Sequence, residues 1–293
     1  MITFPKGYMA KIKDYINLMR VRQWYKNLIV FLALIFSENL FNGEMFWITV
    51  LAFFSLSLVS SAGYVINDIC DRKKDQLHPE KRYRPIAAGR IKAPSAIILV
   101  ILLLTIGLFL AYSLTNWFFI IIASLFIATQ IYTFYLKNIL FADILTISSL
   151  FAIRAISGGL AIDVRISPWL ILCPFFLAMF LGVGKRKADI HLMKKEANKT
   201  RKVLEYYTET LINQMMTLST VLLIVSYSLY SFLSEHPNLI YTLPFALYTI
   251  LQFFYLINKG STIARNPEEI FKDKYLVIGL ILWVIITGVL IYI

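Results

Sequence analysis

The chain has 293 residues, of which 59% are hydrophobic and 15% aromatic, and its formal net charge is +12. That much apolar surface exceeds what a water-soluble core of this length can bury, which excludes a soluble globular protein. The composition is typical of a polytopic membrane protein. Its positive charge is explained by membrane topology, and because no soluble domain exists to present a groove, we expect no nucleic acid among its partners.

The first predicted element is an interfacial segment over residues 1–24. Apolar side chains recur there every three to four residues among lysines, as in a helix that lies in the plane of the membrane interface: Met9, Ile12, Tyr15, Ile16 and Met19. No long apolar run ending in small residues begins the chain, so we expect no cleaved signal peptide.

Nine apolar segments follow. A helix that crosses the hydrocarbon layer needs about 20 apolar residues. The predicted spans are 25–43, 45–66, 94–114, 117–136, 139–161, 168–184, 213–233, 239–257 and 275–293. The sequence therefore predicts an all-α bundle of nine transmembrane helices that forms one membrane domain over residues 1–293.

The distribution of basic residues sets the orientation. Alternate loops, together with the N-terminal segment, carry 27 of the 29 Lys and Arg residues. By the positive-inside rule these loops and the N-terminus face the cytoplasm, in a multi-pass protein of the cell membrane. We expect two of these loops, 67–93 and 185–212, to border an active-site cavity that opens to the cytoplasm.

Cysteine and histidine add little chemistry. The two cysteines, Cys70 and Cys173, lie far apart, and the three histidines share no metal-ligand spacing. This excludes a disulfide framework and argues against a zinc site. Any metal ion here should be bound by oxygen ligands.

The most informative polar stretch follows the span 45–66. In helical geometry Asn67, Asp71 and Asp75 form an i, i+4, i+8 stripe that Asp68 joins, so that all four side chains point into one cavity. Such oxygen ligands suit Mg²⁺, which takes one or two carboxylates and completes its shell with water and substrate phosphates. The alternative is a solvated helix end whose acids balance the basic run 72–74.

A basic segment with a Pro and a Gly, residues 82–90, follows the acids. The planar guanidinium of arginine pairs with phosphate through two hydrogen bonds, so Arg82 and Arg84 are candidate ligands for a diphosphate. Contacts with anionic lipid headgroups are the alternative explanation of these charges.

A related pattern returns at 184–189, at the end of another predicted span. Lys185 and Arg186 could hold a second anion, and Asp189 is a candidate metal ligand, although Met193 occupies the position four residues on. Ordinary positive-inside charge explains the segment equally well.

Four further basic residues are candidate phosphate ligands. They are Arg22, Lys26, Lys137 and Arg154. The last lies inside a predicted span, where an ionisable side chain is a functional hypothesis by default, although an ion pair would also explain it.

These motifs resemble those of the UbiA superfamily of membrane prenyltransferases. Its first signature, Asn-Asp-x-x-Asp-x-x-x-Asp, is matched by Asn67, Asp68, Asp71 and Asp75. The segments 22–27, 78–89 and 184–186 are similar to those of its decaprenyl-phosphate phosphoribosyltransferase branch. The chain departs from prenyl-transferring members in two places: Asp189 stands alone, and Tyr132 lies five residues before Lys137.

The resemblance implies a nine-helix bundle that moves the 5-phosphoribosyl group of phosphoribosyl diphosphate onto a polyprenyl phosphate and releases diphosphate. It implies that Mg²⁺ is held by Asp68, Asp71 and Asp75, with Asn67 orienting the diphosphate. The implied ligands of the diphosphate are Arg82, Arg84 and Lys137, and those of the lipid phosphate are Arg22, Lys26, Lys185 and Arg186.

Two other functions stay open at this point. A prenyltransferase would use the same acids with a polyprenyl diphosphate as donor. A transporter concentrates ionisable residues near the membrane midplane, whereas here only Arg154 lies deep in a predicted span. Two anionic substrates need two basic clusters, and the chain supplies them, which favours the phosphoribosyltransferase.

Overall fold

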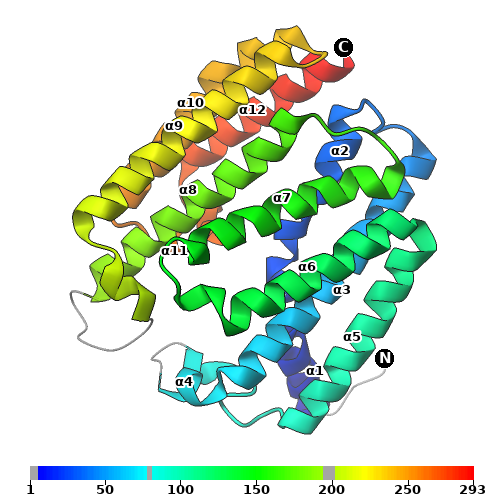
Figure 1. The fold of residues 1–293 in the computed structure, drawn as a ribbon, viewed down its shortest axis with the longest axis vertical. Helices are drawn as coiled ribbons and strands as arrows, with labels where there is room; N and C mark the ends of the chain where they lie inside the picture. The colour runs from blue at the N-terminus through cyan, green and yellow to red at the C-terminus, as the bar shows by residue number, and fades with distance from the viewer. Residues whose placement is uncertain (1–5, 78–80, 194–201) are drawn as a thin grey trace. The chain divides into compact units, whose positions relative to one another are not determined.

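The structure is a computed structural model that describes residues 6–77, 81–193 and 202–293. The predicted motif residues 78–80 and the loop part 194–201 lie outside the described residues. Within the described ranges all regular secondary structure is helical: α-helices, which Figure 1 labels, and 3₁₀-helices, which are written η. This confirms the all-α prediction.

The first half of the chain contains α1 (Lys6–Leu18), η1 (Val21–Val30), α2 (Phe31–Phe36), α3 (Gly43–Cys70), α4 (Arg72–Gln76), η2 (Lys81–Tyr83), α5 (Ala93–Leu114), α6 (Asn116–Phe134) and η3 (Leu136–Asn138). The second half contains α7 (Ala142–Ile162), α8 (Pro168–Met193), η4 (Lys202–Tyr206), α9 (Glu209–Leu233), η5 (Pro237–Thr242), α10 (Leu243–Asn258), α11 (Thr262–Arg265), η6 (Pro267–Lys272) and α12 (Lys274–Tyr292).

Seven helices within the described residues are long and apolar enough to cross a membrane: α3, α5, α6, α7, α9, α10 together with η5, and α12. The 26 residues of α8 also exceed the length that a bilayer requires. The protein is therefore a multi-pass membrane protein, as predicted. The seven segments match seven of the nine predicted spans, and the count of nine is not confirmed.

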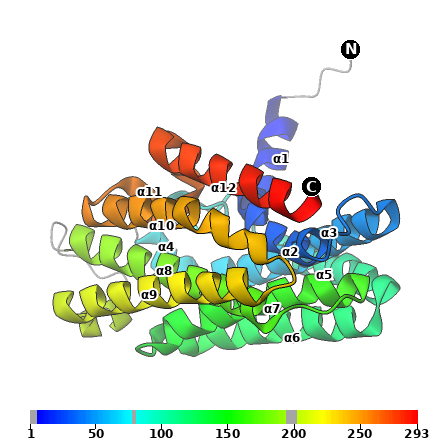
Figure 2. The same cartoon turned by 90° about the horizontal axis from the view of Figure 1, so that it is seen from above.

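The chain divides into two compact units, which are described separately. The first unit comprises Met1–Leu34, Asn39–Thr133 and Ser157–Val164. Within it α3 and α5 run side by side (Figure 2). A Cβ atom added at Gly107 would lie 2.7 Å from Val59 Cγ2, so the glycine permits this close approach, and Ser55 Oγ donates to the Gly107 carbonyl at 2.7 Å.

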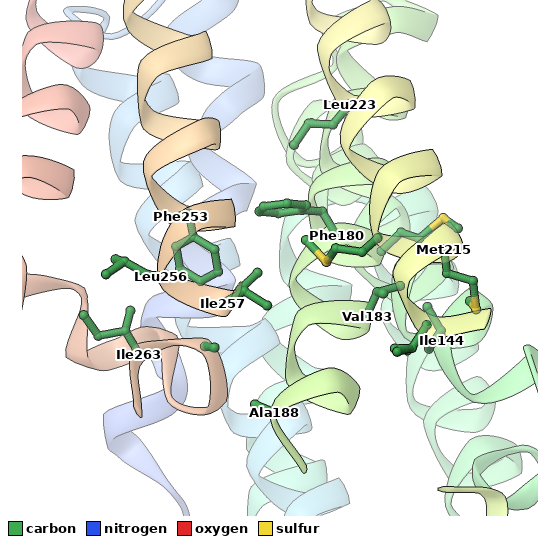
Figure 3. Close-up of a cluster of buried hydrophobic side chains, with 14 of the residues drawn as sticks. Ile144, Phe180, Val183, Ala188, Met215, Leu223, Phe253, Leu256, Ile257 and Ile263 are labelled. Atoms are coloured by element: carbon green, nitrogen blue, oxygen red, sulfur yellow. The ribbon is translucent and has the colours of Figure 1, made fainter. Parts of the chain in front are cut away.

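The second unit comprises Ile35–Glu38, Phe134–Ile156 and Arg165–Ile293. Its helix α8 lies beside α9, and α10 lies beside α12. Phe180 and Val183 of α8, Met215 of α9 and Phe253 of α10 meet in one buried apolar cluster (Figure 3). These side chains hold the helices together where α8 carries its polar end.

The predicted span 25–43 is wrong as a single α-helix. The chain instead forms the 3₁₀-helix η1 and then only six residues of α2. A 3₁₀-helix has three residues per turn, so every third side chain lies in one straight row. Trp24, Asn27 and Val30 form such a row in η1.

This row matches the surface of α3. Trp24 Nε1 donates to Ser61 Oγ at 3.0 Å, and Asn27 Nδ2 donates to Ser57 Oγ at 3.1 Å. Three residues of 3₁₀-helix and four residues of α-helix each rise about 6 Å, so the two rows keep step. These two hydrogen bonds to α3 favour the 3₁₀ geometry of η1.

Gly158 allows the end of this row to pack. A Cβ atom at this position would lie 2.1 Å from the Val30 carbonyl oxygen, which no side chain tolerates. The missing side chain at Gly158 therefore lets α7 approach the backbone of η1 closely.

Candidate active site

The acidic stripe begins at the end of α3, where the helix is interrupted. Helix α3 ends at Cys70, Asp71 occupies the cap with φ −89° and ψ 5°, and α4 then begins at Arg72. The backbone hydrogen bonds nevertheless continue at helical spacing, from the Asp71 amide to the Asn67 carbonyl at 2.9 Å and from the Asp75 amide to the Asp71 carbonyl at 2.8 Å, so the predicted i, i+4, i+8 spacing persists across this break. Asp68 and Asp75 are buried, whereas Asn67 and Asp71 are half-buried.

Two arginines meet the two buried acids. Arg20 Nη2 lies 2.5 Å from Asp68 Oδ1, and Arg84 Nη1 lies 3.0 Å from the same oxygen. Arg84 Nη1 also lies 2.7 Å from Asp75 Oδ2, so one nitrogen bridges both carboxylates. We call Arg20, Asp68, Asp75 and Arg84 the acid–arginine cluster. It brings together Asp68, Asp75 and Arg84, all predicted from sequence, and adds Arg20.

The backbone of Arg20 is in a conformation that non-glycine residues seldom adopt. Its φ of 52° and ψ of 44° place it in the left-handed region, directly before η1. The guanidinium carbon lies 4.9 Å from the centroid of the Tyr64 ring, one helical turn before Asp68. Ser61 Oγ donates to the Met19 carbonyl at 2.8 Å and fixes the chain just before Arg20.

The segment that carries Arg84 is anchored on both sides. Ile86 is fully buried in the core formed by α1, α3 and α5. Arg90 donates from Nε to Asp14 Oδ1 of α1 at 2.9 Å and from Nη2 to the Tyr83 carbonyl at 2.8 Å. These contacts tie α1 to the backbone beside Arg84.

The remaining basic candidates of the first unit lie nearer the surface. Arg82 is exposed, and its side chain stacks on Tyr83 and donates to the Tyr83 hydroxyl at 2.7 Å. Arg22 is exposed, and Lys26 donates to Gln23 Oε1 at 3.3 Å. The structure does not bring these three into the acid–arginine cluster.

The second unit holds a different charged group. Arg186 Nε lies 2.8 Å from Asp143 Oδ2, and the Tyr207 hydroxyl donates to Asp143 Oδ1 at 2.6 Å. The Phe141 amide donates to the Tyr207 oxygen at 3.3 Å. Burial and the hydrogen bond to Asp143 raise the pKa of Tyr207, so the phenol stays protonated. We call Asp143, Arg186 and Tyr207 the buried clamp.

This clamp changes the interpretation of Arg186. The sequence predicted it as an anion ligand, but its side chain is buried and paired with Asp143. A carboxylate inside the predicted span 139–161 was the signal that could have revealed the pair, because buried acids need partners. Tyr207 and Tyr64 gave no comparable signal.

Four predicted residues of the second unit lie elsewhere. Lys137 is half-buried in η3, and Lys185 is exposed on α8. Asp189 accepts from Arg265 Nε at 3.1 Å. Arg154 is buried, donates to the Leu150 carbonyl at 3.1 Å and lies over the Phe151 ring.

The acid–arginine cluster offers oxygen ligands for a divalent cation. No three His, Cys, Asp or Glu side chains within the described parts of the chain are grouped as a complete metal site. Asp68 and Asp75 do present two carboxylates joined by a single cationic nitrogen. Mg²⁺ usually takes one or two carboxylates and obtains the remaining oxygens from water and phosphates, so these residues fit it.

Comparisons with known proteins identify relatives of this chain. The chain is 36% identical to a protein of Mycolicibacterium smegmatis named decaprenyl-phosphate phosphoribosyltransferase, over 98% of this chain and 94% of the relative. It is 32% identical to one of the same name from Corynebacterium glutamicum, over 95% of this chain and 86% of the relative.

A solved structure has the same fold. It is a UbiA homolog from Archaeoglobus fulgidus bound to GPP and Mg²⁺, with a TM-score of 0.71 at 18% identity, over 91% of this chain and 98% of that one. Residues 28–269 match the model of the UbiA prenyltransferase family. From this match and the two relatives we conclude that the chain belongs to the UbiA prenyltransferase family.

Proposed function

We propose that this protein transfers the 5-phosphoribosyl group of phosphoribosyl diphosphate to a polyprenyl phosphate and releases diphosphate. The observation that carries the proposal is the similarity, over nearly the full chain, to the relatives named decaprenyl-phosphate phosphoribosyltransferase. The acid–arginine cluster supplies the groups that a diphosphate leaving group needs.

The diphosphate belongs at the acid–arginine cluster. Asp68 and Asp75 would hold Mg²⁺, with Asp71 and Asn67 as further candidate oxygen ligands beside them. A bound magnesium ion neutralises charge on the leaving oxygens. Arg84, whose guanidinium already lies at these acids, would take part of the same charge, with Arg82 on the exposed side.

The reaction needs little acid–base chemistry. When diphosphate leaves the anomeric carbon, positive charge develops on the sugar ring, as in glycoside cleavage. A lipid phosphate is already anionic at neutral pH and attacks without a general base. The residues of the site therefore act by positioning the substrates and by stabilising charge.

Basic side chains near the membrane surface are the candidate ligands of the lipid phosphate. In the first unit these are Arg22 and Lys26, beside the interfacial helix α1. In the second unit Lys137, Arg154 and Lys185 stay candidate anion ligands, and Asp189 a candidate metal ligand. We place the protein in the cell membrane with nine spans, its N-terminus and basic loops in the cytoplasm.

The test is a transfer assay on the purified protein in detergent. Mg²⁺, decaprenyl phosphate and radiolabelled phosphoribosyl diphosphate are combined, and label is followed into the organic phase. We expect labelling that requires the lipid phosphate and disappears with EDTA. Label transferred in EDTA would contradict the metal requirement.

A parallel reaction contains a polyprenyl diphosphate with an aromatic acceptor. Prenyl transfer there, with no labelling from phosphoribosyl diphosphate, would replace the proposed reaction by that of a prenyltransferase.

A further inference from the structure

We propose that Arg20 and Arg84 neutralise the Asp68–Asp75 pair in the metal-free protein. When a metal ion binds to these acids, the two arginines pair with the substrate diphosphate instead. Metal and diphosphate then bind interdependently, and Arg20 is a diphosphate-binding residue. This inference rests on the proposed function, because it concerns the same site.

The first argument is the position of Arg84. Its Nη1 atom lies 3.0 Å from Asp68 Oδ1 and 2.7 Å from Asp75 Oδ2. A cation that bridged these two oxygens would need the space that this nitrogen now fills. Arg84 must therefore withdraw before a metal ion can bind these two oxygens together.

The second argument is charge balance. Asp68 and Asp75 carry two negative charges, and Arg20 and Arg84 carry two positive ones, so the cluster is neutral. One divalent cation supplies the same two charges. If it joined these four groups without an anion, they would carry two surplus positive charges beside two buried carboxylates, which is unfavourable. A diphosphate removes that surplus.

The third argument is exposure. The side chains of Arg20 and Arg84 are 18% and 26% exposed, whereas those of Asp68 and Asp75 are 3% and 5% exposed. The carboxylates are buried, whereas the arginine side chains are partly accessible. The arginines are thus the members that can turn to an arriving anion.

The fourth argument is the placement of Arg20. Its left-handed backbone is a cost that surrounding structure must support, and such residues gather at binding sites. Contact with the Tyr64 ring holds its guanidinium beside Asp68. A short rotation would let it keep one N–H near Asp68 and offer the others to phosphate oxygens.

The experiment measures Mn²⁺ binding by electron paramagnetic resonance, with and without inorganic diphosphate, on the full-length protein in detergent. For the unsubstituted protein we expect Mn²⁺ affinity to rise about 10-fold with diphosphate, an ordinary size for coupled sites. By reciprocity Mn²⁺ should raise diphosphate affinity by the same factor.

Arg20→Gln should bind Mn²⁺ alone more tightly, because one competing positive charge is gone, and should lose most of the gain from diphosphate. Lys73→Gln is the matched control, since it removes one exposed positive charge two residues before Asp75. Arg84→Gln repeats the test if the first variant does not fold.

Equal Mn²⁺ affinity with and without diphosphate in the unsubstituted protein would overturn the inference. So would an Arg20→Gln protein that behaves like the Lys73→Gln control. The assay contains neither lipid nor sugar, so its result is separate from the transfer reaction. Uncoupled binding with active transfer rejects this inference alone, and coupled binding without transfer rejects the proposed function alone.

Discussion

The acid–arginine cluster of the first unit and the buried clamp of the second unit use the same ionic chemistry for different ends. In the first, both arginines are partly exposed and share one carboxylate oxygen. In the second, Arg186 is 4% exposed and Asp143 is fully buried, with Tyr207 on its other oxygen. The comparison teaches that exposure, more than the identity of the pair, decides whether an ion pair can exchange partners.

Energetics explains the difference. Removing one partner of a buried pair leaves an uncompensated charge in the interior and costs about 3–5 kcal/mol. A partly exposed guanidinium recovers much of that loss by rehydration. Substitutions in the acid–arginine cluster should therefore lower mainly the transfer activity, and substitutions in the buried clamp should lower mainly the stability of the fold.

The largest expected effect is on transfer activity in Asp68→Asn. The substitution keeps the shape but removes the charge that both arginines and a metal ion use. We expect transfer to fall at least about 100-fold, as when a preorganised electrostatic group is lost. The radiolabel assay measures this, with circular dichroism to check folding.

Asp163→Asn is the control for Asp68→Asn, because it removes an exposed carboxylate of the same unit that is not a member of the acid–arginine cluster. It should keep most of the activity. Full activity in Asp68→Asn would show that this carboxylate is not part of the active site. The contrast drawn between the acid–arginine cluster and the buried clamp would then be wrong.

The next effect is on stability in Asp143→Asn. Arg186 would be left buried with a neutral partner, at a cost of about 3–5 kcal/mol. We expect the midpoint of thermal unfolding in detergent to fall by on the order of 10 °C. Asp68→Asn should lower it less. The reverse order of the two midpoints would break the distinction between an exchangeable and a fixed pair.

The smallest effect is expected for Tyr207→Phe. It removes one hydrogen bond to the Asp143 carboxylate, which contributes about 1.5–3 kcal/mol when the acceptor is charged. Its thermal midpoint should lie between those of the unsubstituted protein and Asp143→Asn. A midpoint equal to that of the unsubstituted protein would remove Tyr207 from the clamp.

Tyr207 should also make the stability of the protein depend on pH in the alkaline range. Its pKa is raised in the folded state, by burial first and then by the Asp143 bond. Its stabilising effect is therefore complete below the unfolded pKa of about 10 and declines as pH rises from there toward the raised folded value. The difference in midpoint between the unsubstituted protein and Tyr207→Phe should shrink above about pH 10.

Much of the fold was predictable from the sequence because apolar length alone marks a membrane helix. The predicted spans 94–114 and 275–293 match α5 and α12 to within one residue at each end, and the predicted span 45–66 lies inside the longer helix α3. The span 25–43 failed because apolar composition does not distinguish a 3₁₀-helix from an α-helix. That distinction arises from the contacts of Trp24 and Asn27 with α3.

The candidate site was predictable where several charges lie close in sequence. Asp68, Asp75 and Arg84 fall within 17 residues of one another and meet in space. Arg20 and Asp68 are 48 residues apart, so no local pattern joined them. The pairing of Asp143 with Arg186 was not predicted for the same reason, because 43 residues separate them in the sequence.

The register between η1 and α3 limits how the chain length can change. One residue inserted between Trp24 and Asn27 would turn the Asn27 side chain away from Ser57 by about a third of a turn. An insertion of three residues restores the direction and lengthens the row by about one 6 Å step. Length variation between residues 24 and 30 should therefore be accepted in threes, a rule that variant libraries of this segment can exploit.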